Sequence, residues 1–147
     1  ISRKKLPDLG MVINYEYLWH SQYDAGMENG VKTRPCIVVR VKDTGSVMVV
    51  PITHHPQNMK EAVEIPAQTS ARLGLDEQKS YIVCSELNQF KWAGPDVHLI
   101  PNTNSCVYGV LPTALYNTVT TKIGFLGRGR HLRVVSRTDT EGKAVND

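Results

Sequence analysis

Hydrophobic and polar positions alternate along the first apolar segment of the chain. Between residues 11 and 19 every odd position is apolar or aromatic, and the even positions and the next residue include Asn14, Glu16 and His20. A period of two residues is typical of a β-strand with one buried face. The segment that follows, 20–33, contains two glycines among mixed polar residues and is predicted to be a loop.

Short apolar runs predict further strands along the chain, and two segments have the pattern of helices. Strands are expected at 36–41, 47–52, 61–66 and 80–87, and 131–138 is a last strand or an arm. The turn KDTG between the second and third strands indicates a hairpin. A short helix is expected near 69–75 with Gly74 as its stop, and another from Pro112 to about Ile123, with Gly124 beyond it. Residues 93–106 are expected to form a long loop.

This order of elements predicts the fold class. Five or more short strands with hairpin-like connections and two small helices favour a mainly β, partly open barrel with appended helices. The helices are too few for alternating βαβ units. We expect one domain over 1–147, with its core at about 10–136 and flexible termini at 1–9 and 138–147.

Composition excludes several classes of protein. The 147 residues are 41% hydrophobic and 21% charged, which is ordinary for a globular domain. No apolar run approaches the roughly 18 residues of a membrane span, and the N-terminus lacks the apolar run of a signal peptide. Cys36, Cys84 and Cys106 have no CxxC spacing, and Cys36 and Cys84 lie inside apolar runs, so buried free thiols in a reducing cytoplasm are predicted. No metal site is expected, because adjacent strand residues such as His54 and His55 point to opposite faces.

Charge is unevenly distributed, although the net charge is only +3. Between residues 120 and 137 there is no acidic residue, and the basic ones are Lys122, Arg128, Arg130, His131, Arg133 and Arg137. Such a basic end is typical of a protein that binds a polyanion and equally of a solvated C-terminal face.

Arg34 and Thr53 are the strongest candidates for chemistry. In VKTRPCIVV, Pro35 restricts the backbone of Arg34 to an extended conformation, which directs a permanently charged guanidinium at the mouth of a strand. Thr53 ends the antiparallel partner strand, so its hydroxyl is expected beside Arg34, where both could contact one phosphate. The alternatives are a solvated surface arginine and a threonine that is only a strand former.

Other side chains have two interpretations each. His54 and His55 follow Thr53 and are candidate acids or bases, or solvent-facing loop residues. Phe90 and Trp92 could stack on RNA bases, or pack in the core on one face of a strand. The cations Lys32, Arg128 and Arg130 could follow an RNA backbone or belong to a solvated surface.

An ordered set of motifs resembles the PemK/MazF family of bacterial toxins from type II toxin–antitoxin systems, over roughly residues 10–135. In chain order the motifs are GMV, ENGVKTRPCIVV, VVPITHHP, EIPAQTSARLGL, SELNQFKWAGPD and YGVLP. The arginine–proline before one strand and the proline–x–threonine ending the next are the most specific. The loop at 93–106 and the two histidines after Thr53 depart from the best-known members.

The resemblance implies an SH3-like barrel of the PemK/MazF/CcdB type, usually a homodimer. It implies a growth-inhibiting endoribonuclease, an mRNA interferase, that cuts single-stranded RNA at specific sequences without metal or cofactor. It places the catalytic arginine at Arg34, the threonine at Thr53 and an acidic loop residue at Glu28, which is either a base or an organiser of its loop. It also implies a cognate antitoxin protein, and operator DNA bound by the toxin–antitoxin complex, as partners.

Two other functions are compatible with the same sequence. One is a non-catalytic toxin of this fold that acts on a protein such as DNA gyrase, which would not need Arg34 and Thr53. The other is a nucleic-acid-binding module without chemistry. Cleavage of RNA by the pure protein, or its failure, distinguishes them from the nuclease.

Overall fold

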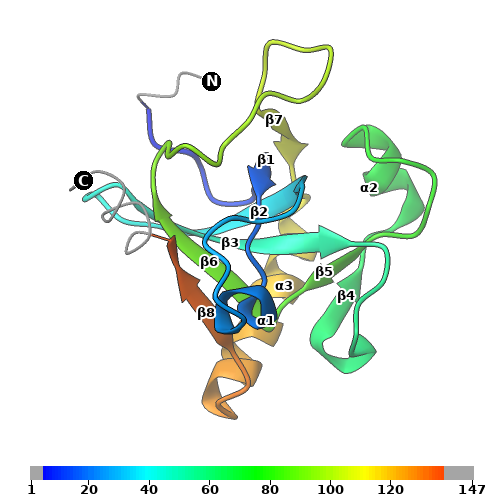
Figure 1. The fold of residues 1–147 in the computed structure, drawn as a ribbon. Coiled ribbons are helices and arrows are strands. Elements are labelled where there is room, and N and C mark those ends of the chain that lie inside the picture. The colour runs from blue at the N-terminus through cyan, green and yellow to red at the C-terminus, as the bar shows by residue number, and fades with distance from the viewer. Residues whose placement is uncertain (1–4, 138–147) are drawn as a thin grey trace.

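The computed structural model describes residues 5–137, which form one eight-stranded sheet with three α-helices (Figure 1). The strands are β1 (Met11–Glu16), β2 (Thr33–Val41), β3 (Ser46–Thr53), β4 (Ala62–Glu64), β5 (Tyr81–Val83), β6 (Glu86–Lys91), β7 (Val107–Val110) and β8 (Arg133–Ser136). The helices are α1 (His20–Asp24), α2 (Ala67–Arg72) and α3 (Thr113–Arg128), and a 3₁₀ turn covers Met59–Glu61.

Strand β3 is the branch point of the sheet. One edge of β3 pairs with β2, while the other pairs with β6 along residues 46–49 and with β5 at residues 52–53. The sheet then continues from β2 to β1 and β7, and from β5 to β4. All these pairs are antiparallel, and only β6 and β8 run parallel among the named pairs. The prediction of a mainly β, partly open architecture with appended helices is confirmed.

The central strands are buried on both faces, which corrects the expectation of a single buried face for β1. Its four middle residues are all buried. Val12 packs in one hydrophobic cluster with α3, whereas Ile13 and Tyr15 pack in a second cluster with Phe90. The alternation along the strand is therefore real, but it separates two cores instead of a core from solvent.

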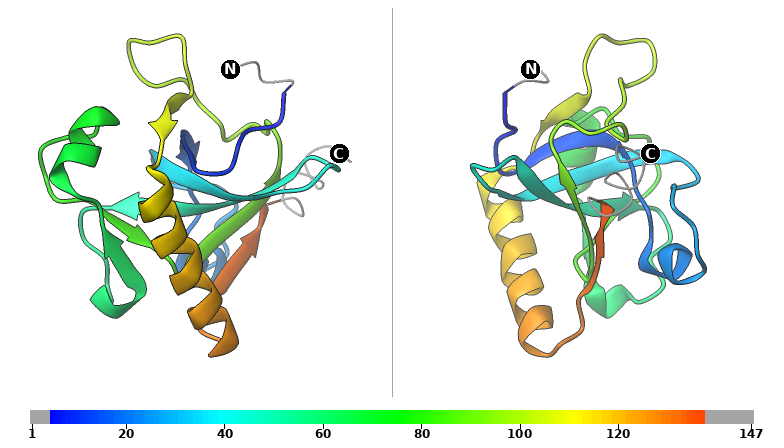
Figure 2. Two further views of the ribbon diagram at one scale, coloured as in Figure 1. Left: turned by 180° about the vertical axis from the view of Figure 1, so that it is seen from behind. Right: turned by 60° about the vertical axis from the view of Figure 1, so that its left-hand side comes forward.

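Helix α3 lies along one side of the sheet (Figure 2). Its Val119 and Leu126 are buried in the first cluster. The prediction that the helix ends before Gly124 is wrong, because α3 continues to Arg128. Burial of Leu126 against the sheet outweighs the modest helix penalty of a glycine, about 1 kcal/mol.

Two local predictions also differ from the structure, and one strand, β7, was not predicted. Residues 20–24 of the predicted loop form α1, in which the Gln22 side chain accepts a hydrogen bond from the Trp19 amide at 3.1 Å. The apolar run at 80–87 divides into β5 and β6, which pair with different parts of β3. The strand β7 follows the predicted long loop at 93–106. Its register with β1 contains an irregularity at residues 12–13. The segment 131–138, predicted to be a last strand or an arm, contains the strand β8 within its described residues.

All three cysteines are free and buried, as predicted. Burial raises the pKa of Cys84 to about 12, so this thiol is inert at neutral pH. Within residues 5–137, no helix has the length and apolar character needed to cross a membrane. The predicted flexible segment 138–147 lies outside the described residues.

Candidate active site

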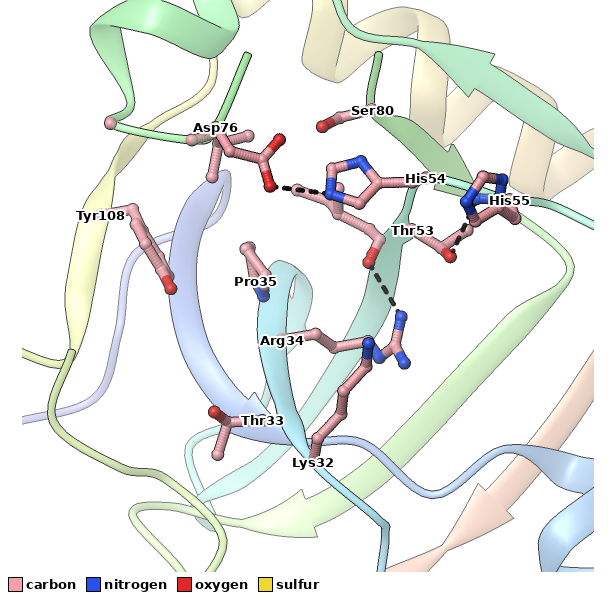
Figure 3. A pocket seen from close by; sticks show the side chains of 13 residues that line it. Lys32, Thr33, Arg34, Pro35, Thr53, His54, His55, Asp76, Ser80 and Tyr108 are labelled. Carbon is pink, nitrogen blue, oxygen red and sulfur yellow. Dashed lines mark hydrogen bonds and ion pairs between the residues drawn. The ribbon is translucent and has the colours of Figure 1, made fainter. Parts of the chain in front are cut away.

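Arg34 and Thr53 meet at the ends of two neighbouring antiparallel strands. The register pairs Cys36 with Pro51, and extending it by two residues along each strand places Arg34 opposite Thr53. The Arg34 Nη1 donates a hydrogen bond to the carbonyl of Ile52 at 3.4 Å. Both side chains line one cavity, seen in Figure 3. The juxtaposition expected from the hairpin is therefore present.

The guanidinium of Arg34 is half-buried and keeps an unused donor. Its carbon lies 5.0 Å from the ring centre of Trp19, which makes a cation–π contact. Burial lowers the pKa of Arg34 from its ordinary value, but an arginine remains charged at neutral pH. Its buried Nε has no hydrogen-bond partner among the described residues. A phosphate oxygen that reached this donor would satisfy it.

The hydroxyl of Thr53 is oriented by the chain that follows it. Its Oγ1 accepts a hydrogen bond from the His55 amide at 3.3 Å. A hydroxyl that accepts in this way can still donate its own proton. Thr53 is therefore able to donate to the same phosphate as Arg34.

Two cavities flank this pair and share Arg34, Thr53 and His55 in their walls. The first has a volume of about 310 Å³ and extends toward His54, Asp76 and Tyr108 (Figure 3). The second has a volume of about 510 Å³ and extends toward Trp19, Asn58, Glu61 and Glu86. A chain of nucleotides laid across Arg34 would thus have a hollow on each side of the phosphate.

The two histidines differ in their freedom to transfer protons. His54 Nε2 lies 2.8 Å from Asp76 Oδ2, and its Nδ1 lies 3.0 Å from the carbonyl oxygen of Lys79. Both neighbours accept hydrogen bonds, so both ring nitrogens of His54 are engaged within the protein. His55 is exposed and follows Thr53 by two residues. Of the two, His55 is the better placed to exchange a proton with a substrate.

Two acidic residues of the second cavity were not predicted from the sequence. Glu86 is buried, and its Oε1 accepts hydrogen bonds from the Tyr17 hydroxyl at 3.2 Å and the His20 amide at 3.1 Å. Burial raises its pKa above the ordinary value. For Glu61, burial acts to raise the pKa, but hydrogen bonds from Ser85 and Arg133 outweigh it and the pKa is lowered. A signal existed: Glu86 is a charged residue inside the apolar run at 80–87, and a charged residue buried there needs partners.

Three other candidates lie away from the Arg34–Thr53 pair. Phe90 is fully buried and stacks on Tyr15 with the ring centres 4.5 Å apart, so its suggested role as a platform for RNA bases is wrong. Trp92 is half-buried and packs against the same core, which is the alternative interpretation. Glu28 is exposed and lies outside both cavities, and its backbone carbonyl accepts a hydrogen bond from Arg137.

The predicted basic residues do not form one surface. Lys32 lines the first cavity, whereas Arg128 and Arg130 are exposed at the end of α3, outside both cavities. Arg133 pairs with Glu61, and Arg137 is 1% exposed and pairs with Asp96 at 2.8 Å. Two of the arginines in the basic end are therefore paired with acidic residues, Arg137 inside the protein and Arg133 at its surface. Among the described residues no group of three or more His, Cys, Asp or Glu could hold a metal ion.

Comparison with solved structures identifies the fold. No protein-family model matches the sequence, and the comparison with curated proteins returns no match. The bent, mainly antiparallel open sheet is the fold of MazF-like proteins, as predicted.

Two solved structures share this MazF-like fold with the chain. An endoribonuclease in complex with its cognate antitoxin from Mycobacterial species has a TM-score of 0.53 and 14% identity, over 81% of this chain and 92% of that one. The MazE–MazF structure from Deinococcus radiodurans has a TM-score of 0.55 and 16% identity, over 83% of this chain and 96% of that one.

Proposed function

We propose that this protein is the toxin of a toxin–antitoxin system and a metal-independent endoribonuclease that cuts single-stranded RNA at specific sequences. One observation carries the proposal: the Arg34 guanidinium, with a buried and unused Nε, lies at the strand end that faces Thr53. The MazF-like fold supports it, since one structural neighbour is described as an endoribonuclease.

RNA supplies its own nucleophile for this reaction. The 2′-OH attacks the adjacent phosphorus, the bond to the 5′ oxygen of the next nucleotide breaks, and a cyclic phosphate and a free 5′-OH result. Arg34 stabilises the charge that grows on the phosphoryl oxygens, and Thr53 donates a second hydrogen bond to them. One group must take the 2′-OH proton and another must protonate the leaving oxygen. His55 and Glu86, which line the same cavity as Arg34, are our candidates for these roles.

The partners follow from the same proposal. A neighbour of the same fold is described in complex with its cognate antitoxin, and we propose an antitoxin for this chain. We further propose a homodimer, operator DNA as a ligand of the toxin–antitoxin complex, and a cytoplasmic location.

The decisive experiment is cleavage of single-stranded RNA by the pure protein in EDTA. We expect cutting to continue with the metal removed, and to stop when the nucleotide 5′ to the cleaved bond carries a 2′-deoxy sugar. We expect Arg34→Ala to lower kcat by roughly a hundredfold or more and to leave the protein folded, with a thermal midpoint only slightly lowered by the lost contacts to Trp19 and Ile52. Arg40→Ala is the matched control, because Arg40 lies on the same strand but is exposed and outside both cavities.

Two results would overturn the proposal. One is an RNA pool left intact by the wild-type protein at micromolar concentration. The other is growth arrest on expression that persists in Arg34→Ala, which would indicate a toxin that acts on a protein target.

A further inference from the structure

The first cavity is lined by three side chains that the proposed cleavage step does not use: the aromatic Tyr108, the acceptor Asp76 and the cation Lys32. Tyr108 and His54 stand on either side of Pro35, with Asp76 beside His54 (Figure 3). Tyr108 is half-buried. Aromatic side chains are the usual stacking partners of unpaired RNA bases, and this cavity opens directly onto Arg34 and Thr53.

The carboxylate of Asp76 is held in place from two sides. Its Oδ2 contacts His54 Nε2 at 2.8 Å, and its Oδ1 accepts a hydrogen bond from the Gln78 amide at 3.1 Å. An ionised carboxylate has about four acceptor positions, so these two contacts leave one position on each oxygen. The result is a pair of adjacent acceptors with a fixed direction, at the edge of the cavity.

Basic side chains line the same cavity as this carboxylate. His54 Nε2 contacts Asp76, and Arg34, which is always charged, lines the cavity as well. Lys32 lines the same cavity and is exposed. The cavity wall therefore contains permanent positive charge as well as this carboxylate, which makes it compatible with an RNA ligand.

We propose that this cavity is a nucleobase subsite that selects guanine next to the cleaved bond, with Asp76 as the residue that determines the selection and Tyr108 as the stacking wall. Guanine presents two adjacent donors, N1–H and the N2 amino group, on its Watson–Crick edge. Adenine, cytosine and uracil each place an acceptor beside their donor, which a fixed carboxylate disfavours. The inference rests on the proposed function for the presence of RNA in the site.

The test changes the guanine on one side of the proposed contact and the Asp76 carboxylate on the other. Sequencing of the 5′ ends made by the wild-type protein should show guanine enriched at one position next to the cut. Replacing that guanine by inosine, which lacks the N2 amino group, should lower kcat/KM by about ten- to a hundredfold. Asp76→Asn retains an oxygen for His54 but replaces an acceptor with a donor, and it should abolish the difference between guanine and inosine. Glu77→Gln is the matched control, because Glu77 is adjacent and exposed but lies outside this cavity.

A binding measurement separates the subsite from the nuclease. Fluorescence anisotropy with a 2′-deoxy-substituted, uncleavable RNA should give the same preference for guanine over inosine in wild type, and no preference in Asp76→Asn. Cleavage without a guanine preference, or with a preference that Asp76→Asn leaves unchanged, overturns the subsite while the nuclease stands. In the remaining outcome, the uncleavable RNA shows a guanine preference that depends on Asp76 while wild-type protein cuts no ordinary RNA. That result supports the subsite and overturns the nuclease.

Discussion

The side chain of Arg34 is restricted by its contacts before any substrate binds. Pro35 limits the backbone, the Trp19 ring lies 5.0 Å from the guanidinium, and the Ile52 carbonyl accepts a hydrogen bond from Nη1. In the proposed nuclease, little conformational entropy would then be lost when a phosphate binds, as catalysis by preorganised charge requires. The sequence predicted the direction of Arg34 through Pro35, but not the ring of Trp19, because that contact depends on how residues 17–20 are held.

The side chain of Glu86 predicts how the stability of the fold changes with pH. Burial raises its pKa above the ordinary value of 4.5, so the folded protein binds this proton more tightly than the unfolded chain does. Protonation of Glu86 therefore stabilises the fold, and that contribution is lost as the pH rises through the raised pKa. We expect Glu86→Gln to match wild type below pH 4.5 and to become the more stable of the two as the pH rises.

Urea unfolding at a series of pH values measures this difference. The glutamine oxygen can still accept from Tyr17 and His20, so the comparison isolates the charge. Glu64→Gln, on the exposed side of β4, should follow the wild-type curve. A Glu86→Gln variant that loses stability at neutral pH would show that the ionised carboxylate is a net stabilising group.

At the scale of elements, the pairing of β3 decides which segments meet at the site. Its last two residues pair with β5, which leads toward β6 and Glu86, while its other edge aligns Thr53 with Arg34 on β2. The hairpin of β2 and β3 was predictable, because a four-residue turn joins two apolar runs. The division of the next apolar run between β5 and β6 was not, because apolar periodicity carries no information about strand partners.

Helix α3 contains a glycine that its fold does not require. A Cβ added at Gly124 would lie 3.5 Å from Arg128 Nη1, an ordinary van der Waals distance. We expect Gly124→Ala to raise the free energy of unfolding by about 0.5–1 kcal/mol, because alanine loses less backbone entropy in a helix. Denaturant titration with an unchanged m-value would check this.

Gly127 is the matched position on the same helix. There a Cβ would lie 3.2 Å from Leu132 Cδ1, so we expect a smaller gain for Gly127→Ala, or none. Equal gains at the two positions would contradict the argument that packing distinguishes them.

At the scale of the whole molecule, a buried arginine near the end of the described chain joins distant segments. Arg137 Nη2 pairs with Asp96 at 2.8 Å, and its Nη1 donates to the Glu16 carbonyl at 2.9 Å. Its Nη2 also reaches the Glu28 carbonyl at 3.5 Å. The segment after β8 thus fixes the end of β1, the loop at 93–106 and the loop before β2. Asn88 adds to this by bonding both backbone groups of Leu18.

We expect Arg137→Met to lower the free energy of unfolding by about 3–5 kcal/mol, because it leaves the Asp96 charge buried without this partner. Chemical denaturation at pH 7 measures the loss, and hydrogen exchange should report faster opening at residues 25–32. Arg128→Met, at an exposed position of α3, should change stability by no more than about 0.5 kcal/mol. A loss below 1 kcal/mol for Arg137→Met would show that the pair with Asp96 adds little. If Arg137→Met does not fold, Arg137→Lys can be measured instead. It keeps the charge but not the fork of donors, so we expect a smaller loss in the free energy of unfolding.

The sequence by itself determined the β-rich class, the hairpin that aligns Arg34 with Thr53, and the buried state of the cysteines. Each of these depends on local properties: the period of apolar residues, the stereochemistry of proline and the turn that sets strand register. Only the tertiary structure decided that Phe90 packs in the core, that Glu86 lines the second cavity and that Arg137 is buried. Those outcomes depend on contacts between residues 41 to 122 positions apart along the chain, which no short window of sequence contains.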